Sequence, residues 1–149
     1  MVELRKIDAD NFEECIRLQV ADRQKGYVAS NLYSLAQTYV YHDTAYPFAI
    51  YADCVMVGFI MLGYYAKQNG YTLWRFMIDA RFQGKGYGRA ALQLGIAYLA
   101  DTYAAKEVFT SFVQGNTAAE ALYTSVGFRR TGEIDGDEIG LRLDMINRE

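Results

Sequence analysis

The sequence predicts an α+β domain that spans residues 1–149: a twisted mixed sheet of about seven strands flanked by about four helices. Short apolar runs separated by turn residues recur along the chain, as expected for strands of ordinary length. From residue 71 to residue 113, a strand, a glycine-rich turn, a long amphipathic stretch and another strand follow one another. This series is typical of a right-handed crossover between parallel strands.

The composition indicates a globular protein. With 149 residues the chain can build a sizeable core, and 52% hydrophobic with 22% charged residues is ordinary. No apolar run reaches the roughly 20 residues of a membrane span, and residues 1–6 contain no apolar signal core, so we expect a cytoplasmic protein without a membrane partner. The net charge of −3 argues against a nucleic-acid partner. Two cysteines and one histidine indicate no metal site, and Cys15 and Cys54 are expected to be packing residues.

The N-terminal third predicts one strand and two helices. Residues 2–7 form the strand. Asp10, with Glu13 three residues later, is expected to cap the first helix. The second helix begins near Ser30. Its packed apolar face is expected to consist of Leu32, Leu35, Ala36 and Tyr39.

The central part predicts an antiparallel meander. Its strands are residues 48–52, 55–62 and 71–78, separated by turn signals at positions 53–54 and 69–70. Gly58 lies inside the second strand, which indicates a bulge or a close backbone contact. The third strand leads directly into the glycine-rich stretch.

The stretch from Arg81 to Ala90 contains three glycines at alternate positions. They expose backbone N–H groups at the start of a helix, where the macrodipole favours negative charge. Lys85 and Arg89 add positive charge, so the stretch predicts a phosphate or pyrophosphate site. It is not a Walker loop, because no Ser or Thr follows Lys85, and its third glycine comes one residue too early for the dinucleotide fingerprint.

The helix after this loop is expected to begin near Gly88, and a strand follows at residues 108–113. A further helix follows Asn116. Thr117 and Glu120 predict its capping box, and Asn116 and Tyr123, seven residues apart, are expected on one side of it. Its sheet-packing face is expected to consist of Ala118, Ala121, Leu122 and Ser125. Two last strands are predicted at residues 128–134 and 138–145.

These motifs resemble the GCN5-related N-acetyltransferases. The pattern [RQ]-x-x-G-x-[GA] is met by Gln83, Gly86 and Gly88, and N-x-x-A-x-x-L-Y-x-x-x-G-F runs from Asn116 to Phe128. The order strand, loop, helix matches the core of this family. Within the family, the chain is most similar to the bacterial spermine/spermidine acetyltransferases, notably over residues 75–86.

The resemblance implies a function and a site. The chain would be an N-acetyltransferase with acetyl-CoA as co-substrate, bound where two parallel strands splay apart. Tyr123 would be the general acid that protonates the departing thiolate, and a backbone N–H of the strand at residues 76–78 would stabilise the oxyanion. The implied cofactor-binding residues are Phe76, Met77, Ile78, Gln83, Gly84, Lys85, Gly86, Tyr87, Gly88, Arg89 and Asn116.

The general base is left unassigned. An alkylammonium has a pKa of about 10.4, so a group or a water chain must take its proton at neutral pH. Some relatives carry a carboxylate on the strand before the loop, whereas this chain has Trp74 and Arg75 there, and Asp79 is expected to be structural.

The sequence leaves the acceptor open. A polyamine is favoured, a protein or peptide amine is an alternative, and a non-catalytic acetyl-CoA sensor is a third hypothesis. The sequence also leaves open whether the chain forms a homodimer. A polyamine requires spaced carboxylates, and the candidates are Glu13, Glu14, Asp22, Asp43, Glu133, Asp135, Asp137 and Glu138.

Overall fold

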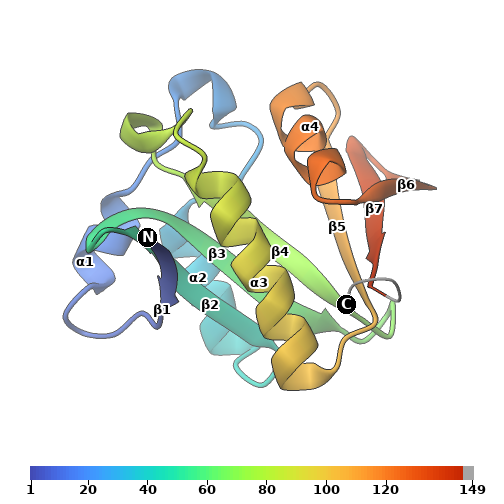
Figure 1. Cartoon of the computed structure of the whole chain (residues 1–149), viewed down its shortest axis with the longest axis horizontal. Coiled ribbons are helices and arrows are strands. Elements are labelled where there is room, and N and C mark those ends of the chain that lie inside the picture. The colour runs from blue at the N-terminus through green and yellow to red at the C-terminus, as the bar shows by residue number, and fades with distance from the viewer. Residues whose placement is uncertain (146–149) are drawn as a thin grey trace.

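The structure, a computed structural model, describes residues 1–145. Within them, a seven-stranded mixed sheet and four α-helices confirm the predicted fold class (Figure 1). The strands are β1 (Val2–Arg5), β2 (Ala45–Ala52), β3 (Val55–Tyr65), β4 (Gly70–Ile78), β5 (Glu107–Val113), β6 (Arg129–Asp135) and β7 (Glu138–Asp144). The helices are α1 (Phe12–Arg17), α2 (Asn31–Val40), α3 (Tyr87–Tyr103) and α4 (Thr117–Ser125), with short 3-10 turns η1 (Asp22–Gln24) and η2 (Ala80–Phe82).

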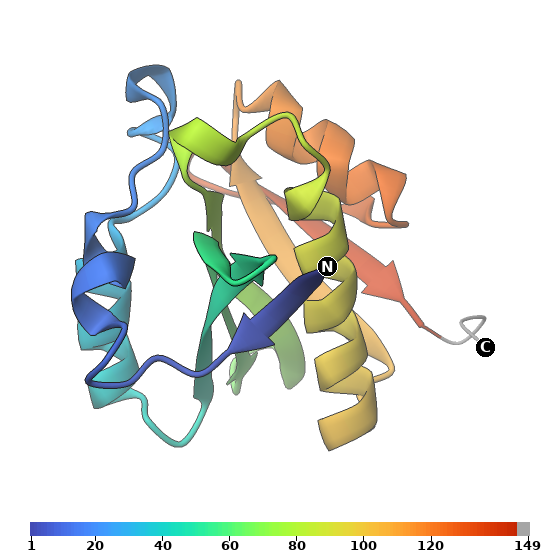
Figure 2. The ribbon, with the colours of Figure 1, turned by 60° about the vertical axis from the view of Figure 1, so that its left-hand side comes forward.

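The sheet order is β1-β2-β3-β4-β5-β7-β6, and within residues 1–145 the pair β4–β5 is the parallel one. Helices α1 and α2 cover one face and α3 covers the other (Figure 2). Each face buries its own apolar cluster. The central strand β3 is buried on both faces from Met56 to Gly63, as expected for a strand with helices on both sides of the sheet.

Strands β4 and β5 separate toward their C-terminal ends. In the described chain they pair only as Tyr71–Val108 and Thr72–Phe109. The register between β3 and β4 shifts at this point, so that Trp74 is an extra residue in β4. Such a bulge increases the local twist of a strand. It contributes to turning the end of β4 away from β5, and the gap becomes the site described below.

The close backbone contact that was predicted at Gly58 is confirmed. A Cβ at Gly58 would lie 2.4 Å from the carbonyl oxygen of Met77, a distance that real Cβ atoms essentially never show. The β2–β3 register also shifts beside Gly58. A glycine is therefore needed where β3 presses against the end of β4.

Only Leu35 of the apolar face predicted for α2 packs against the core, and the other three residues of that face are exposed. The buried residues of α2 are Asn31 and Ser34, whereas Leu32 and Tyr39 are 55% and 84% exposed. The Asn31 side chain donates to the carbonyl oxygen of Cys15 at 2.9 Å, and the Ser34 hydroxyl donates within its own helix. Because the buried polar groups are bonded, the polar face can face the sheet at little cost. The helix does begin as predicted, with Ser30 accepting from the Tyr33 N–H at 3.1 Å.

The predicted cap of α1 is wrong. Asp10 lies before the helix, and the residue at the cap, Asn11, makes no capping bond to it. Instead, the Asp8 carboxylate accepts from the N–H groups of Asp10 and Asn11 at 2.9 and 3.2 Å. The carboxylate two residues upstream therefore organises the turn that leads into α1.

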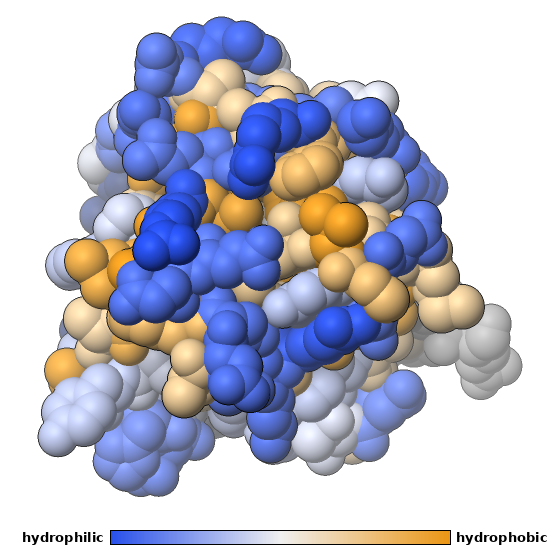
Figure 3. Space-filling model, turned by 90° about the vertical axis from the view of Figure 1, so that its left-hand side faces the viewer, coloured by the Kyte–Doolittle hydropathy of each residue, from blue (hydrophilic) through white to orange (hydrophobic). Residues whose placement is uncertain are grey.

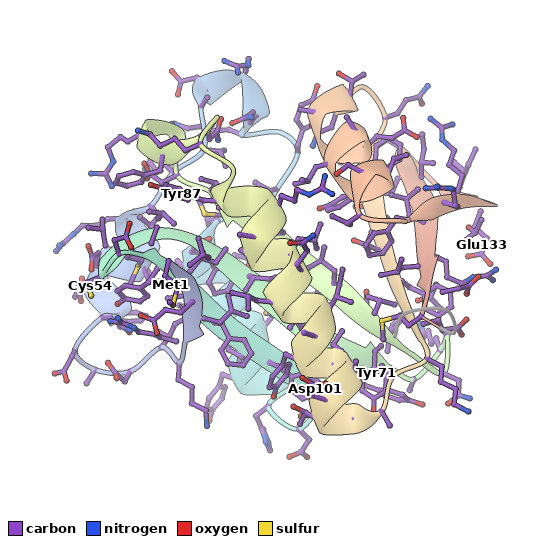
Figure 4. The ribbon with its side chains drawn as sticks, in the orientation of Figure 1. Met1, Cys54, Tyr71, Tyr87, Asp101 and Glu133 are labelled. Carbon is purple, nitrogen blue, oxygen red and sulfur yellow. The ribbon has the colours of Figure 1, made fainter. Side chains whose placement is uncertain are left out.

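The two cysteines differ in environment. Cys15 is fully buried, as expected of a packing residue, but Cys54 is exposed at the β2–β3 turn with φ 69°, so the packing prediction is wrong for it (Figure 4). Among residues 1–145, no helix combines the length and the apolar character that crossing a bilayer requires.

Candidate active site

The glycine-rich loop has a left-handed backbone at two positions. Gly84 and Gly86 have φ of +78° and +84°, and a Cβ on either would meet nothing within 4 Å. Gly88 differs, because a Cβ there would lie 3.5 Å from the Phe76 ring and would make ordinary contacts with neighbouring side chains. The first two glycines are thus required by the backbone, and the third is not.

The loop leaves the first N–H groups of α3 available. Gly86 is the cap residue and has no side chain to accept from them. The first α-helical bond runs from the Ala90 N–H to the Gly86 carbonyl oxygen at 3.3 Å, so the preceding N–H groups have no acceptor within the helix. Together with the positive end of the helix dipole, these free N–H groups are suited to binding an anion.

Gln83 holds the glycine-rich loop in place through its side-chain amide. Its side-chain amide donates to the Ile78 carbonyl oxygen and to the Gln24 side chain, both at 2.9 Å. The same Gln24 oxygen accepts from the Ala21 N–H at 3.1 Å. The donor capacity of Gln83 is therefore used within the protein, and its part in the site is to hold the loop against the α1–α2 connection.

The two cations of the glycine-rich loop, Lys85 and Arg89, differ in their position relative to the cleft. Arg89 lines the cleft and donates to the Ser125 hydroxyl at 2.9 Å and to the Ser125 carbonyl oxygen at 3.3 Å, which links α3 to α4. Lys85 is exposed and is not among the lining residues. Tyr87 lines the cleft at the first turn of α3 (Figure 4).

The outer edge of β4 is open beside the cleft. The Asp79 N–H donates to Val57 in β3, and the Met77 carbonyl oxygen lies against Gly58 of β3. Because backbone groups alternate sides along a strand, those of Phe76 and Ile78 point away from β3 toward the gap. The three residues named from the sequence thus divide: Phe76 and Ile78 present backbone groups to the cleft, and Met77 uses its own for the sheet.

Tyr123 projects from α4 into the gap between β4 and β5. Its side chain is 7% exposed, lines the cleft and lies with its ring centroid 5.7 Å from that of Phe128. Burial raises the pKa of the Tyr123 phenol well above its ordinary value of about 10, and the neighbouring Thr110 side chain lowers it by less. The phenol is therefore a proton donor that stays protonated at neutral pH.

Asn116, not a Thr117–Glu120 box, caps α4. The Asn116 side-chain oxygen accepts from the Ala119 N–H at 3.4 Å, while Glu120 pairs with Arg130 at 2.7 Å. The predicted capping box is wrong because Thr117 is already the first helical residue. Asn116 lines the cleft, and its amide group remains a donor on that side.

Of the residues predicted to face the sheet from α4, Leu122 packs against the core, and the prediction is wrong for the other three. The buried residue of α4 is Tyr123, and the predicted face is largely exposed. The reason is that α4 lies beside the gap between β4 and β5, and only the long side chain of Tyr123 extends far enough to be buried between the two strands. The exposed members of the predicted face are Ala118, Ala121 and Ser125.

One cleft of about 810 Å³ lies where β4 and β5 separate, and Phe76, Gly86 and Tyr123 are among the residues that line it. Of the eight carboxylates considered from the sequence, Asp137 and Glu138 line it. Glu13 and Glu14 lie on α1, which is on the side of the molecule away from the β6–β7 hairpin (Figure 1). The face on the left-hand side of Figure 1 mixes hydrophilic and hydrophobic surface (Figure 3). Glu133 projects from β6 at the opposite edge (Figure 4). The acidic surface of the cleft is therefore confined to the start of β7.

Asp79 is structural, as predicted. It is 4% exposed and accepts from the Gln19 N–H at 2.9 Å, the Arg81 N–H at 3.0 Å and the Arg81 side chain at 2.8 Å. Burial raises the pKa of its carboxyl group, but these hydrogen bonds together hold the pKa below its ordinary value. All the recorded partners of Asp79 lie within the protein, so it is not a candidate base.

We expect Asp79→Asn to lower the free energy of unfolding by about 1–3 kcal/mol at neutral pH. The pKa of Asp79 is lower in the folded than in the unfolded chain, so its contribution is full above the unfolded value near 4 and disappears as pH falls through the folded value. Urea unfolding from about pH 7 to about pH 3 should show the difference between wild type and variant shrinking. A difference that is independent of pH would contradict this role of the ionised carboxylate.

The sequence analysis missed Thr110. It is 8% exposed, and its hydroxyl donates to the Leu73 carbonyl oxygen at 3.0 Å, which bridges β5 to β4 at the point where the strands separate. The signal was present: in β5 the buried positions alternate as Val108, Thr110 and Phe112, so a polar residue stands in an apolar row.

Parallel strands that separate around an anion-binding turn, with a buried phenol at the gap, define an acyl-CoA-dependent acyltransferase. The family model described as the Acetyltransferase (GNAT) family matches residues 4–128. The chain belongs to this family, and it is an acetyl-CoA-dependent N-acetyltransferase. The resemblance inferred from the two motifs is thus confirmed.

The proteins that are similar to this chain are also named as N-acetyltransferases. The chain is 32% identical over 141 residues to the spermine/spermidine N(1)-acetyltransferase of Bacillus subtilis (strain 168), covering 90% of this chain and 91% of that protein. In fold it matches a spermidine N-acetyltransferase from Vibrio cholerae in complex with CoA and spermine, with a TM-score of 0.76, 17% identity and coverage of 96% and 95%. It also matches the PaiA N-acetyltransferase from Thermoplasma acidophilum in complex with coenzyme A, with a TM-score of 0.70, 19% identity and coverage of 97% and 99%.

Proposed function

We propose that the enzyme transfers the acetyl group of acetyl-CoA to a primary amine of a polyamine such as spermine or spermidine. The observation that carries this proposal is the 32% identity, over 90% of the chain, to a protein that is named for that activity. Asp137 and Glu138 support it, because two adjacent carboxylates on the cleft suit an ammonium group remote from the reacting amine. A sensor without catalysis is disfavoured by the buried phenol in the gap.

In this proposal, different groups of the chain bind the parts of acetyl-CoA and stabilise the transition state. The N–H groups at the start of α3 bind the pyrophosphate, while the open edge of β4 and the amide of Asn116 bind the pantetheine arm. An N–H at Phe76 or Ile78 stabilises the negative charge that develops on the thioester carbonyl oxygen during direct attack by the neutral amine. Acetyl-CoA supplies the activated acyl group.

Tyr123 is proposed as the general acid. Its phenol lies at the gap between β4 and β5, and its raised pKa keeps it protonated at neutral pH. The thiolate that departs as the thioester C–S bond breaks has a conjugate acid with a pKa of about 8.5, so it is a weaker base than the Tyr123 phenolate. Tyr123 therefore stabilises the departing sulfur by a hydrogen bond, and its proton passes to the sulfur as the phenolate regains a proton from the positively charged nitrogen of the attacking amine.

The polyamine proposal predicts a salt-dependent KM. Remote ammonium groups must be held by carboxylates, so kcat/KM for spermidine should exceed that for propylamine, and KM for spermidine should rise with salt. Replacing both Asp137 and Glu138 with their amides should raise KM for spermidine by about tenfold or more, because hydrogen bonds to charged groups contribute about 1.5–3 kcal/mol. Thiol release measures the rates.

Glu133→Gln is the matched control, because this carboxylate lies outside the cleft. It should leave KM unchanged. Equal kcat/KM for propylamine and spermidine in the wild type would count against a polyamine acceptor.

A further inference from the structure

Arg75 is a partly buried cation that lines the cleft. It lies beside the β4 bulge, at the centre of the strand that borders the gap, and it lines the cleft together with Asp137 and Glu138. A cation in a partly dehydrated site repels an ammonium group of the acceptor and attracts an anionic group. The side chain therefore requires its own explanation.

The guanidinium is held in place without a counter-ion. One nitrogen donates to the Trp74 carbonyl oxygen at 3.0 Å and another donates to the Gln37 side chain of α2 at 3.1 Å. Among residues 1–145, no acidic side chain lies within ion-pair distance of Arg75. Burial lowers the pKa of Arg75, and the more distant Glu138 raises it by less. Two neutral acceptors thus orient a guanidinium that has five N–H donors.

A fixed, partly buried guanidinium with spare donors is suited to a carboxylate. Its planar fork matches the two oxygens of a carboxylate, and the pair is stronger when it is partly desolvated. The cleft then carries charges of both signs, with Arg75 on β4 and the acidic pair at the start of β7. An acceptor that complements both must carry a carboxylate as well as a second ammonium.

We propose that Arg75 binds a carboxylate of the acceptor, so that the cleft takes short diamino acids in addition to polyamines and prefers a diamine with a carboxylate to the same diamine without one. This inference rests on the proposed N-acetylation of diamines. It makes Arg75 a specificity-determining residue, whose removal changes the choice between acceptors rather than the transfer step.

Two matched pairs of acceptors test the inference, because the members of each pair differ only in a carboxylate: ornithine with putrescine, and 2,4-diaminobutyrate with 1,3-diaminopropane. For the full-length enzyme, kcat/KM by thiol release should be about 10–100-fold higher for the carboxylated member, the range expected for hydrogen bonds between charged groups. In Arg75→Gln this ratio should fall to about one or below, with the loss in KM for the amino acids. Arg75→Lys should keep part of the ratio, since it retains the charge but not the fork.

Two variants separate recognition from packing. Gln37→Leu removes one of the two acceptors that orient Arg75 but keeps the guanidinium, so it should retain part of the preference for carboxylated acceptors. A merely structural role of Arg75 predicts the same complete loss as in Arg75→Gln. Arg17→Gln changes an exposed arginine of α1 and should leave all rates unchanged. Melting curves confirm that the variants are folded.

The outcomes distinguish this inference from the proposed function. Acetylation of spermidine with no preference inside either pair, or a preference that survives in Arg75→Gln, overturns the inference and leaves the polyamine proposal standing. Acetylation of ornithine or diaminobutyrate without acetylation of spermidine supports the inference and overturns the polyamine proposal. Failure to acetylate any of the five amines overturns both.

Discussion

Tyr123→Phe is expected to lower kcat by about 10²–10⁴-fold, the range usual for the loss of a general acid. The change removes the phenol and keeps the ring, so the contact with Phe128 and the affinity for acetyl-CoA should be nearly unchanged. Steady-state kinetics measure kcat, and the rise in melting temperature on addition of acetyl-CoA measures binding. Turnover within a few-fold of wild type would assign the proton to water.

The pH dependence sharpens this test. An ordinary tyrosine would lose its proton near pH 10, but burial raises the pKa of Tyr123, so the wild-type donor should persist through the whole range from about pH 7 to about pH 9.5. The wild-type kcat should therefore not fall over this range.

Tyr98→Phe is the matched control for Tyr123→Phe, because Tyr98 lies in an aromatic cluster with Phe48 and Tyr103 and does not line the cleft. It should leave kcat unchanged.

Gly86→Val is expected to abolish the binding of acetyl-CoA. A β-branched residue is strongly disfavoured at φ +84°, so the loop must rearrange, and the N–H groups at the start of α3 turn away from the ligand. The thermal shift with acetyl-CoA should disappear. Binding at wild-type affinity would place the anion site elsewhere.

A control for backbone strain is available in the same chain. Gly132 has φ +91° with nothing within 4 Å of a Cβ, as at Gly86, but it lies on β6 outside the cleft. Gly132→Val should lower the melting temperature, at an expected cost of at least about 1–2 kcal/mol for a left-handed conformation, and should leave the acetyl-CoA shift intact. Loss of the shift in both variants would point to unfolding.

Features encoded within a few neighbouring residues were predictable. The sequence located the strands to within a few residues and the Ser30 cap, because apolar period and cap chemistry depend on neighbours in the chain. It also located the glycine turn at the start of α3, because conformational freedom and helix position suffice to define an anion site. The predicted helix caps were wrong where several polar residues compete for the same N–H groups. Asp8, and not Asp10, accepts hydrogen bonds before α1, and Asn116, and not Thr117, caps α4.

The sequence by itself therefore determined the fold class, the family and the position of the glycine-rich loop that we propose as the pyrophosphate site, all of which depend on local periodicity and on short motifs. The tertiary structure decided which face of α2 is buried, because the polar groups of Asn31 and Ser34 find partners that periodicity does not show. It decided that the backbone groups of Phe76 and Ile78, and not those of Met77, point toward the cleft, because pairing with β3 sets the side of each N–H. It also brought Arg75 into one cleft with the residues at 137–138, although more than 60 positions separate them along the chain, because the sheet order places β7 two strands from β4.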